Sequence, residues 1–445
     1  MRAALRSPWA WAVVALAVRL AYVLAGSGLD AVPWSDSVDY HRLAAHLASG
    51  RGFTLGPDDA LYPTTFRPPL VPALVAPLYA LFGPRYGLSL LLQALLGALV
   101  VPVAAAVARG VARDALLARG VARAVDRDER FVARAAALTA AAIAVWPPLV
   151  YFTGALLTET TASLLVTLSL LLALGLRTAG GTRRALALGA ILALAALARP
   201  TALPLAAVLL AWLALAGPRP RAARMRAVGL ALVAFGLVLL PWTARNRAVT
   251  GAWIPLTSGG GAALWDGNNP LVAADPRWRG GALSLRAVEP YAQEFAGMDE
   301  LAIDRHAGAR ARVFLAADPA RAARMATWKL QRFFRVTSET AVSGDFGPPG
   351  SVWARLARAI DPLVVSWGVL LPFCAAALGW ALARPGRAAC APALAVVVQA
   401  ALAAVYWGSL RFRAPVEPAL VVLGTCGLLV AFEFVSDRRR RRSPP

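Results

Sequence analysis

Long apolar segments recur along almost the whole chain, from Pro8 to Val435, and they constrain the fold more than any other feature. Only 16% of the 445 residues are charged, whereas about a quarter is usual in soluble chains. Segments of this length and composition are typical of helices that cross a membrane. The sequence therefore predicts an all-α integral membrane protein, a multi-span helical bundle of about ten spans.

The first apolar run, Pro8–Ala25, has the length of a signal peptide. No small-residue cleavage site followed by a soluble domain comes after it, so we count it as a span. The ten expected spans are residues 8–26, 86–108, 132–150, 159–177, 185–198, 201–216, 227–243, 360–383, 388–407 and 418–436.

The basic residues are almost all arginine: Lys329 is the only lysine among 46 basic residues, and the net charge is +22. They form short clusters between the apolar runs, which favours a role in membrane orientation over nucleic-acid binding. With ten spans every Arg-rich cluster falls on one side, and the positive-inside rule assigns that side to the cytoplasm. We expect a multi-pass protein of the cell (inner) membrane with both termini cytoplasmic and no nucleic-acid partner.

This topology depends on Pro68–Gly83, an apolar run that is short for a hydrocarbon core about 30 Å thick. Counting it as a span would place the Arg-rich stretch 109–134 outside, so we expect a helix that lies along the outer surface. The predicted parts are an N-terminal transmembrane catalytic module at 1–243 with an outer loop at 27–85, an extracytoplasmic segment at 244–358, C-terminal transmembrane helices at 359–437 and a basic cytoplasmic tail at 438–445.

Polar residues from separate stretches gather at the outer boundary of the predicted bundle. They are Asp36, Asp39, Arg67, Glu159, Arg199, Arg245 with Asn246, and Arg411 with Arg413. Ionisable groups at membrane depth are costly and often mark a functional site. The turn at Arg199 joins two short spans and should lie below the surface, where a lipid phosphate or Glu159 would pair with it. The alternative is that Arg199 snorkels to the headgroups, which is the interpretation we favour for Arg19.

These residue types suit sugar transfer. A carboxylate can take the proton of an acceptor hydroxyl, and arginines can hold a phosphate and stabilise its charge as it leaves. We favour Asp36 as the base, because Asp39 is also explained as a first-turn charge on a short amphipathic helix. Outside the cell there is no supply of nucleotide sugars, so the donor should be linked to a polyprenyl phosphate in the bilayer.

Metal and cofactor sites are not strongly indicated. Three scattered cysteines and three histidines make no zinc site. Asp126-Arg127-Asp128 matches a metal-binding DxD pattern, but in a short Arg-dense loop we take the match as chance. No cofactor is certain, and a divalent metal held by Asp36, Asp39 and Glu159 is left open.

Several short motifs follow one another in a fixed order across residues 8–270. They are Asp36-Ser-Val-Asp-Tyr-His-Arg-Leu-Ala44, Gly50-Arg-Gly-Phe53, Pro63-Thr-Thr-Phe-Arg-Pro-Pro-Leu-Val-Pro72, Leu157-Thr-Glu159, Leu197-Ala-Arg-Pro200, Pro241-Trp-Thr-Ala-Arg-Asn246 and Gly267-Asn-Asn-Pro270. As an ordered set they resemble the bacterial branch of the dolichyl-phosphate-mannose–protein mannosyltransferase family (glycosyltransferase family 39), which has the GT-C fold. The resemblance implies an inverting transferase with a catalytic Asp in its first outer loop, which Asp36 matches. Members often carry adjacent acids there, whereas here the acids are three residues apart.

Two further features have both a functional and a structural interpretation. The glycines at 259–261 and the Gly267–Pro270 motif, which contains the candidate binding residue Asn268, are either an acceptor-facing loop or plain turns. The stretch Trp328–Val336 is an amphipathic surface anchor or, alternatively, a contact for the carrier phosphate.

The sequence thus predicts a glycosyltransferase that moves a sugar from a polyprenyl-phosphate-linked donor to a hydroxyl of a lipid, protein or glycan acceptor at the extracytoplasmic face. In this hypothesis Arg67, Arg199 and Arg245, with Asn246, hold the carrier phosphate, and Glu159 orients an arginine or the sugar. A lipid or solute transporter is one alternative. A glycan polymerase or ligase that uses a polyprenyl pyrophosphate is the other. The sugar, the carrier length and the oligomeric state do not follow from the sequence.

Overall fold

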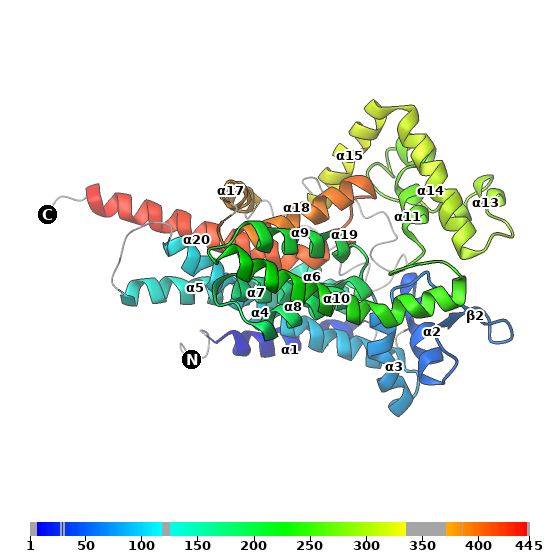
Figure 1. Ribbon diagram of the computed structural model, residues 1–445, viewed down its shortest axis with the longest axis horizontal. Coiled ribbons are helices and arrows are strands. Elements are labelled where there is room, and N and C mark those ends of the chain that lie inside the picture. The colour runs from blue at the N-terminus through cyan, green and yellow to red at the C-terminus, as the bar shows by residue number, and fades with distance from the viewer. Residues whose placement is uncertain are drawn as a thin grey trace.

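The computed structural model describes residues 7–26, 29, 32–117, 125–334, 371–384 and 386–442, and this part of the chain is almost wholly helical (Figure 1). The exception is a short antiparallel pair, β1 (Thr54–Leu55) with β2 (Tyr62–Pro63), in which Thr54 lies opposite Pro63. The pair belongs to the connection between the first two helices of the outer loop.

Helices lie at all ten positions where spans are expected. They are α1 (Pro8–Gly26), α4 (Tyr86–Leu117), α5 (Val125–Ala144) followed by α6 (Pro147–Tyr151), α7 (Glu159–Thr178), α8 (Thr182–Ala198), α9 (Ala202–Leu215), α10 (Arg221–Thr250), α17 (Leu371–Leu382), α18 (Cys390–Val405) and α20 (Glu417–Arg442). Residues 360–370 of the eighth expected span, like Arg335 and Val336 of the predicted anchor, lie outside the described residues.

Five of the described segments are long and apolar enough to cross a membrane by themselves. They are Pro8–Ala25, Tyr86–Leu116, Glu159–Thr178, Arg221–Thr250 and Leu410–Glu433. The pair Glu129–Ala144 and Pro147–Gly154 makes a sixth if a 48° bend is allowed. The predicted multi-span helical membrane fold is therefore confirmed, and α8, α9 and α18 are shorter than the about 20 residues that a straight crossing needs.

Small residues let the bundle helices approach closely. Ala104, Ala105 and Ala108 of α4 and Ala136 of α5 are fully buried in the main core. Gly189 of α8 packs so tightly on the carbonyl of Ala231 in α10 that a Cβ there would overlap it. Close contacts of small residues replace the hydrophobic effect as the basis of helix association inside a bilayer.

The bend between α5 and α6 is stabilised by a buried arginine of α1. Arg19 is completely shielded from solvent and donates to the carbonyl oxygens of Ala144 (3.0 Å) and Ile143 (3.5 Å), and also to Ala15 of its own helix (3.2 Å). Carbonyls at the end of a helix have no partner within it, and cations are favourable there. Arg19 thus caps the C-terminus of α5 and does not extend to the headgroups.

The other elements gather at one end of the bundle, opposite the ends where α1 begins and α20 finishes (Figure 1). They are α2 (Asp36–Ala48), α3 (Leu70–Phe82), η2 (Phe152–Gly154), α11 (Gly260–Gly267), α12 (Pro270–Ala274), η3 (Leu285–Ala287), α13 (Tyr291–Glu294), α14 (Glu300–Ala317), α15 (Pro319–Phe334), α19 (Leu410–Arg413) and η5 (Ala414–Val416). A helix, α3, forms where the surface helix is expected. Its position along the membrane surface stays a prediction.

Candidate functional site

Two acids open the first helix of the outer loop. Asp36 and Asp39 lie in the first turn of α2, three residues apart and so on neighbouring positions of one face. Ser35, directly before them, has φ of 52°, and it is the one non-glycine residue with positive φ in the described part of the chain. Such backbone conformations are costly and concentrate at functional sites.

Arg67 bridges these two acids. It follows β2 in the stretch that leads into α3, and its Nη2 lies 2.7 Å from Oδ1 of Asp36. Its Nε donates to Oδ2 of Asp39 at 2.9 Å. The guanidinium also lies over the rings of Phe66 (4.7 Å) and Tyr40 (5.7 Å), which fix its plane.

Arg411 connects this cluster to the transmembrane helices. It comes from α19, which interrupts the chain between α18 and α20, and its Nη1 lies 2.8 Å from Oδ2 of Asp36. Its Nε donates to Oε1 of Glu159, at the start of α7, at 2.7 Å. A single arginine thus joins residues that are 375 and 252 positions away in the sequence.

Arg199 completes the arrangement from the turn between α8 and α9. Its Nη1 lies 2.9 Å from both Oε1 of Glu159 and Oγ1 of Thr158. The result is a continuous alternation of acids and arginines, which we call the charge network. Its members, in order, are Asp39, Arg67, Asp36, Arg411, Glu159 and Arg199.

Three carboxylates face three guanidinium groups in the charge network, so its formal charges cancel. Burial alone would raise the pKa of Asp36, but the charges and hydrogen bonds of Arg411 and Arg67 lower it well below its ordinary value. Burial likewise lowers the pKa of Arg67, and the acids Asp36 and Asp39 more than reverse this. Both partners are therefore ionised at neutral pH.

The charge network is not fully satisfied. Glu159 is completely buried, and its Oε2 has no hydrogen-bond partner among the described residues; the same holds for Nε of Arg199. Buried polar atoms of native proteins are nearly always paired, so such exceptions often mark a place for a bound group.

The structure brings together five of the eight predicted site residues: Asp36, Asp39, Arg67, Glu159 and Arg199. Arg245 and Asn246 make none of these ion pairs in the described structure. Arg245 donates to the carbonyl oxygens of Thr64 (2.6 Å) and Phe53 (2.9 Å), and Asn246 is buried and donates to the carbonyl of Ile254 at 3.0 Å. Both side chains hold the backbone around α10 and the outer loop, and their contact with substrate stays a prediction.

Asn268 lies at a junction of three elements. Its Nδ2 donates to the carbonyls of Leu264 (2.8 Å) and Val405 (2.9 Å), and its Oδ1 accepts from Nζ of Lys329 at 2.6 Å. The amide therefore joins α11, the end of α18 and α15. Its substrate-binding role is likewise untested.

Sequence reasoning located Arg411 at the outer boundary but gave it no role. The available signal was the pair Arg411 and Arg413 immediately before the last span, since charges at that depth need partners. Arg413 is completely buried and pairs with Glu417 of α20, four residues on. The two arginines thus serve different clusters.

The acids of the charge network do not form a metal-binding cluster. No group of three or more His, Cys, Asp or Glu residues suited to a metal ion occurs in the described ranges. Asp36, Asp39 and Glu159 each pair with an arginine, so guanidinium groups already balance their charge in the place of a cation. These residues as arranged do not fit a resident divalent metal.

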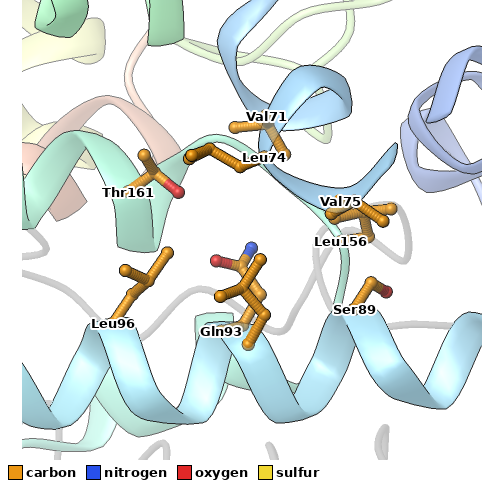
Figure 2. Close-up of a pocket in the computed structure, with 9 residues that line it drawn as sticks. Val71, Leu74, Val75, Ser89, Gln93, Leu96, Leu156 and Thr161 are labelled. Carbon is orange, nitrogen blue, oxygen red and sulfur yellow. The ribbon is translucent and has the colours of Figure 1, made fainter. Parts of the chain in front are cut away.

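A narrow apolar crevice lies between α3, α4 and α7. Figure 2 shows Val71, Leu74 and Val75 of α3 on one side and Gln93 and Leu96 of α4 on the other. The remaining lining residues are Ser89, Leu92, Leu156 and Thr161. The space between atoms is about 180 Å³, including the part open to the surroundings, and no part of it is wide enough for a water molecule.

This helical architecture resembles the GT-C fold, as a comparison with solved structures indicates. The Archaeoglobus fulgidus oligosaccharyltransferase tethered with an acceptor peptide is similar over 98% of this chain and 51% of its own, with a TM-score of 0.56 and 13% identity. The archaeal oligosaccharyltransferase AglB in complex with an inhibitory peptide and a dolichol-phosphate is similar over 97% of this chain, with a TM-score of 0.52 and 14% identity. The chain thus spans about half the length of these enzymes.

ArnT from Cupriavidus metallidurans bound to undecaprenyl phosphate is similar over 98% of this chain and 80% of its own at 16% identity. Its TM-score of 0.43 is too low to strengthen the fold assignment. No protein-family model matches the chain, and no curated protein matches its sequence.

Proposed function

We propose that this chain is a glycosyltransferase of the GT-C type, related to glycosyltransferase family 39, that moves a sugar from a polyprenyl-phosphate-linked donor to an acceptor hydroxyl. The charge network at one end of the helical bundle carries the proposal. It combines the two groups that the reaction needs, a carboxylate for the acceptor proton and arginines for the leaving phosphate.

The end of the bundle that holds the charge network is the extracytoplasmic one in this proposal. The Arg-rich start of α5 and the Arg-rich end of α20 lie toward the other end of the bundle (Figure 1), where the positive-inside rule expects the cytoplasm. Residues 244–358 then form an extracytoplasmic segment above the site, between the transmembrane module at 1–243 and the helices at 359–437. The basic tail at 438–445 is cytoplasmic.

The neutral balance of the charge network suggests how the donor activates the base. A phosphate that takes Arg411 or Arg67 as its partner removes an ion pair from Asp36. The pKa of Asp36 then rises toward its ordinary value, because those two arginines are what lower it. Asp36 thereby becomes a stronger base when the donor is bound.

The reaction is a single displacement with inversion. The acceptor oxygen forms a bond to the anomeric carbon while the bond from that carbon to the phosphate oxygen breaks. The electron pair leaves with the phosphate, whose charge Arg199 and Arg411 stabilise, and the hydroxyl proton goes to Asp36 or, alternatively, to Asp39. The buried Oε2 of Glu159 is placed to orient an arginine or a sugar hydroxyl.

A lipid inventory tests the proposal. Polyprenyl-phosphate lipids are measured by mass spectrometry in cells that lack the gene and in cells complemented with wild type, Asp36→Asn or Asp58→Asn. Asp58 is an exposed acid of the same outer loop, so its variant is the matched control. A monophosphate-linked sugar should accumulate without the protein and be cleared by wild type and Asp58→Asn but not by Asp36→Asn.

Other outcomes would reject the proposal in identifiable ways. An accumulating pyrophosphate-linked oligosaccharide would indicate a polymerase or ligase. No change in any such lipid would favour a transporter. Full clearance by Asp36→Asn would move the base to Asp39.

A further inference from the structure

Asp266 stands outside the charge network, at the end of α11 and directly before the turn that contains Asn268. Its backbone carbonyl accepts two hydrogen bonds, from the amide of Leu283 (2.9 Å) and from Nδ2 of Asn269 (3.1 Å). The following residue, Gly267, packs so closely on the carbonyl of Tyr406 that a Cβ would overlap it. The position of this acid is therefore well defined.

The carboxylate of Asp266 is buried but weakly paired. Its Oδ2 lies 3.5 Å from Nη2 of Arg286, which is long for a charged hydrogen bond. Its Oδ1 is buried and has no hydrogen bond of normal geometry within the described residues. An oxygen with this much unused capacity can accept a hydrogen bond from an incoming hydroxyl group.

A line of contacts joins Asp266 to the charge network. The ring of Phe66 lies under the guanidinium of Arg286 at 5.7 Å and under that of Arg67 at 4.7 Å. Arg67 in turn binds Asp36 and Asp39. Asp266 and the base candidates are thus connected through Arg286, Phe66 and Arg67.

Residues 244–358, which we call the outer segment, are also hydrogen-bonded to the stretch that carries Phe66 and Arg67. Oγ1 of Thr65 donates to Oγ of Ser258 at 2.8 Å, and the amide of Ser258 donates to the carbonyl of Thr65 at 3.0 Å. The amide of Thr65 donates to Oε2 of Glu300, the first residue of α14, at 3.0 Å. The outer segment and the outer loop therefore hold Asp266 and Asp36 in a fixed relation.

The electrostatics agree with this geometry. Burial raises the pKa of Asp266 to about 6, although Arg286 and the nearby Ser284 lower it in part. The charge of Asp36 adds to the increase, so the two acids lie within electrostatic range of each other. Arg286 from η3 and Asp36 from α2 are the charged groups that act on Asp266 most strongly.

We propose that Asp266 is the acceptor-side carboxylate of the active site, which binds a hydroxyl of a sugar or polyol acceptor through its free oxygen and so selects the acceptor. The inference rests on the proposed function, in which Asp36 takes the proton. It assigns the end of the outer segment to acceptor recognition and the charge network to the donor.

The test separates transfer from hydrolysis. The full chain in lipid nanodiscs receives the lipid-linked sugar isolated from cells that lack the gene, first in water alone and then with glycerol as a soluble hydroxyl acceptor. Asp266→Asn should lower kcat/KM for glycerol at least tenfold and by a much larger factor than it lowers hydrolysis by water. Asp266→Glu should recover part of the transfer, and Asp275→Asn, an acid of the same segment paired with Arg277, is the control.

The pH profile of wild type gives a second measurement that needs no variant. Asp266 loses its charge as the pH falls through about 6, so kcat/KM for glycerol should fall there while hydrolysis does not follow the same titration. Equal loss of transfer and hydrolysis in Asp266→Asn, or unchanged transfer, would overturn the inference. If wild type neither hydrolyses nor transfers, the proposed function itself fails, and the inference fails with it.

Discussion

Arg411 and Arg413 lie two residues apart on α19, but they belong to two different clusters of ion pairs. The side chain of Arg411 is 25% exposed, and it is shared between Asp36 and Glu159. The side chain of Arg413 is fully buried, as is that of its partner Glu417. Arg411 belongs to the charge network, in which Oε2 of Glu159 and Nε of Arg199 have no hydrogen-bond partner among the described residues. In contrast, both carboxylate oxygens of Glu417, the partner of Arg413, accept hydrogen bonds.

The cluster around Arg413 joins three parts of the fold. Besides Glu417, Arg413 donates from Nη1 to the carbonyl of Phe333, the penultimate residue of α15, at 2.9 Å. The second oxygen of Glu417 accepts from Nε1 of Trp146 at 2.9 Å, at the bend between α5 and α6. Full burial of both charges among three packed elements indicates a structural role for Arg413, whereas the partly exposed Arg411, shared between two acids, suits a functional one.

The largest effect should follow from breaking the buried pair. Arg413→Ala leaves the carboxylate of Glu417 buried without its cation, which typically costs about 3–5 kcal/mol. We expect a much lower unfolding temperature and a poor yield of folded protein in detergent. Arg310→Ala is the control, because Arg310 pairs with Glu294 at a site where both side chains are about a third or more exposed.

A double variant sharpens this prediction. Arg413→Met combined with Glu417→Leu removes both charges, so it should be more stable than Arg413→Ala alone. If Arg413→Ala unfolds at the wild-type temperature, the structural interpretation of this pair is wrong.

Removing Arg411 should affect activity more than stability. Glu159 keeps Arg199 and Asp36 keeps Arg67 in an Arg411→Ala variant, so no acid of the charge network loses its last partner. Loss of one group that stabilises a developing charge typically lowers the rate by about 10²–10³-fold. Sugar transfer in nanodiscs and the unfolding temperature, measured on the same preparation, should diverge in this way. A variant that loses both together would place Arg411 with Arg413.

A third basic residue behaves differently from both arginines. Lys329 of α15 is buried, and its Nζ donates to Oδ1 of Asn268 (2.6 Å) and to the carbonyl of Val405 (3.0 Å). Burial lowers its pKa to about 7 from the ordinary 10.5. The folded chain then binds fewer protons than the unfolded chain between these values, so stability should rise as the pH rises from about 7 to 10.5.

Thermal unfolding at several pH values checks this prediction, with Lys329→Met as the comparison. The variant should lose the part of the pH slope that comes from the lysine. Lys329→Arg should be less stable than wild type throughout, because a guanidinium stays charged in the same buried position. An identical slope in wild type and Lys329→Met would show that the lysine is charged in the folded protein.

The smallest effect is expected at the surface of the outer loop. Asp58 is 85% exposed and pairs with Arg51 at 2.7 Å. Exposed pairs of this kind contribute little, so Asp58→Asn should leave both activity and unfolding temperature unchanged. A clear loss of activity would mean that this part of the loop contacts a substrate.

Much of the fold followed from the sequence because apolar length and arginine position are local signals. They place helices at all ten expected spans, and they bring Asp36, Arg67, Glu159 and Arg199 to one side before any contact is known. The bend at Trp146 was not foreseen, since it depends on Arg19, which contacts Ala144 from 125 residues away.

The pairing of the site residues could not be derived in the same way. Which arginine meets Asp36 depends on how α19 interrupts the chain between α18 and α20, and this is set by tertiary packing. Arg245 is also an arginine that the sequence places at the outer boundary of the bundle, yet its side chain donates to backbone carbonyls. Asp266 was passed over because its burial and its link through Phe66 exist only in the folded chain.

The cap that Arg19 provides for α5 makes the first helix more than a membrane anchor. During synthesis α1 enters the bilayer long before α5 exists, and until then Arg19 lacks the carbonyls of Ile143 and Ala144. A lone arginine inside a span is costly, so α1 is a poor span until the later helix arrives. A first helix that lacked this arginine would therefore insert more readily and yet leave α5 without its cap.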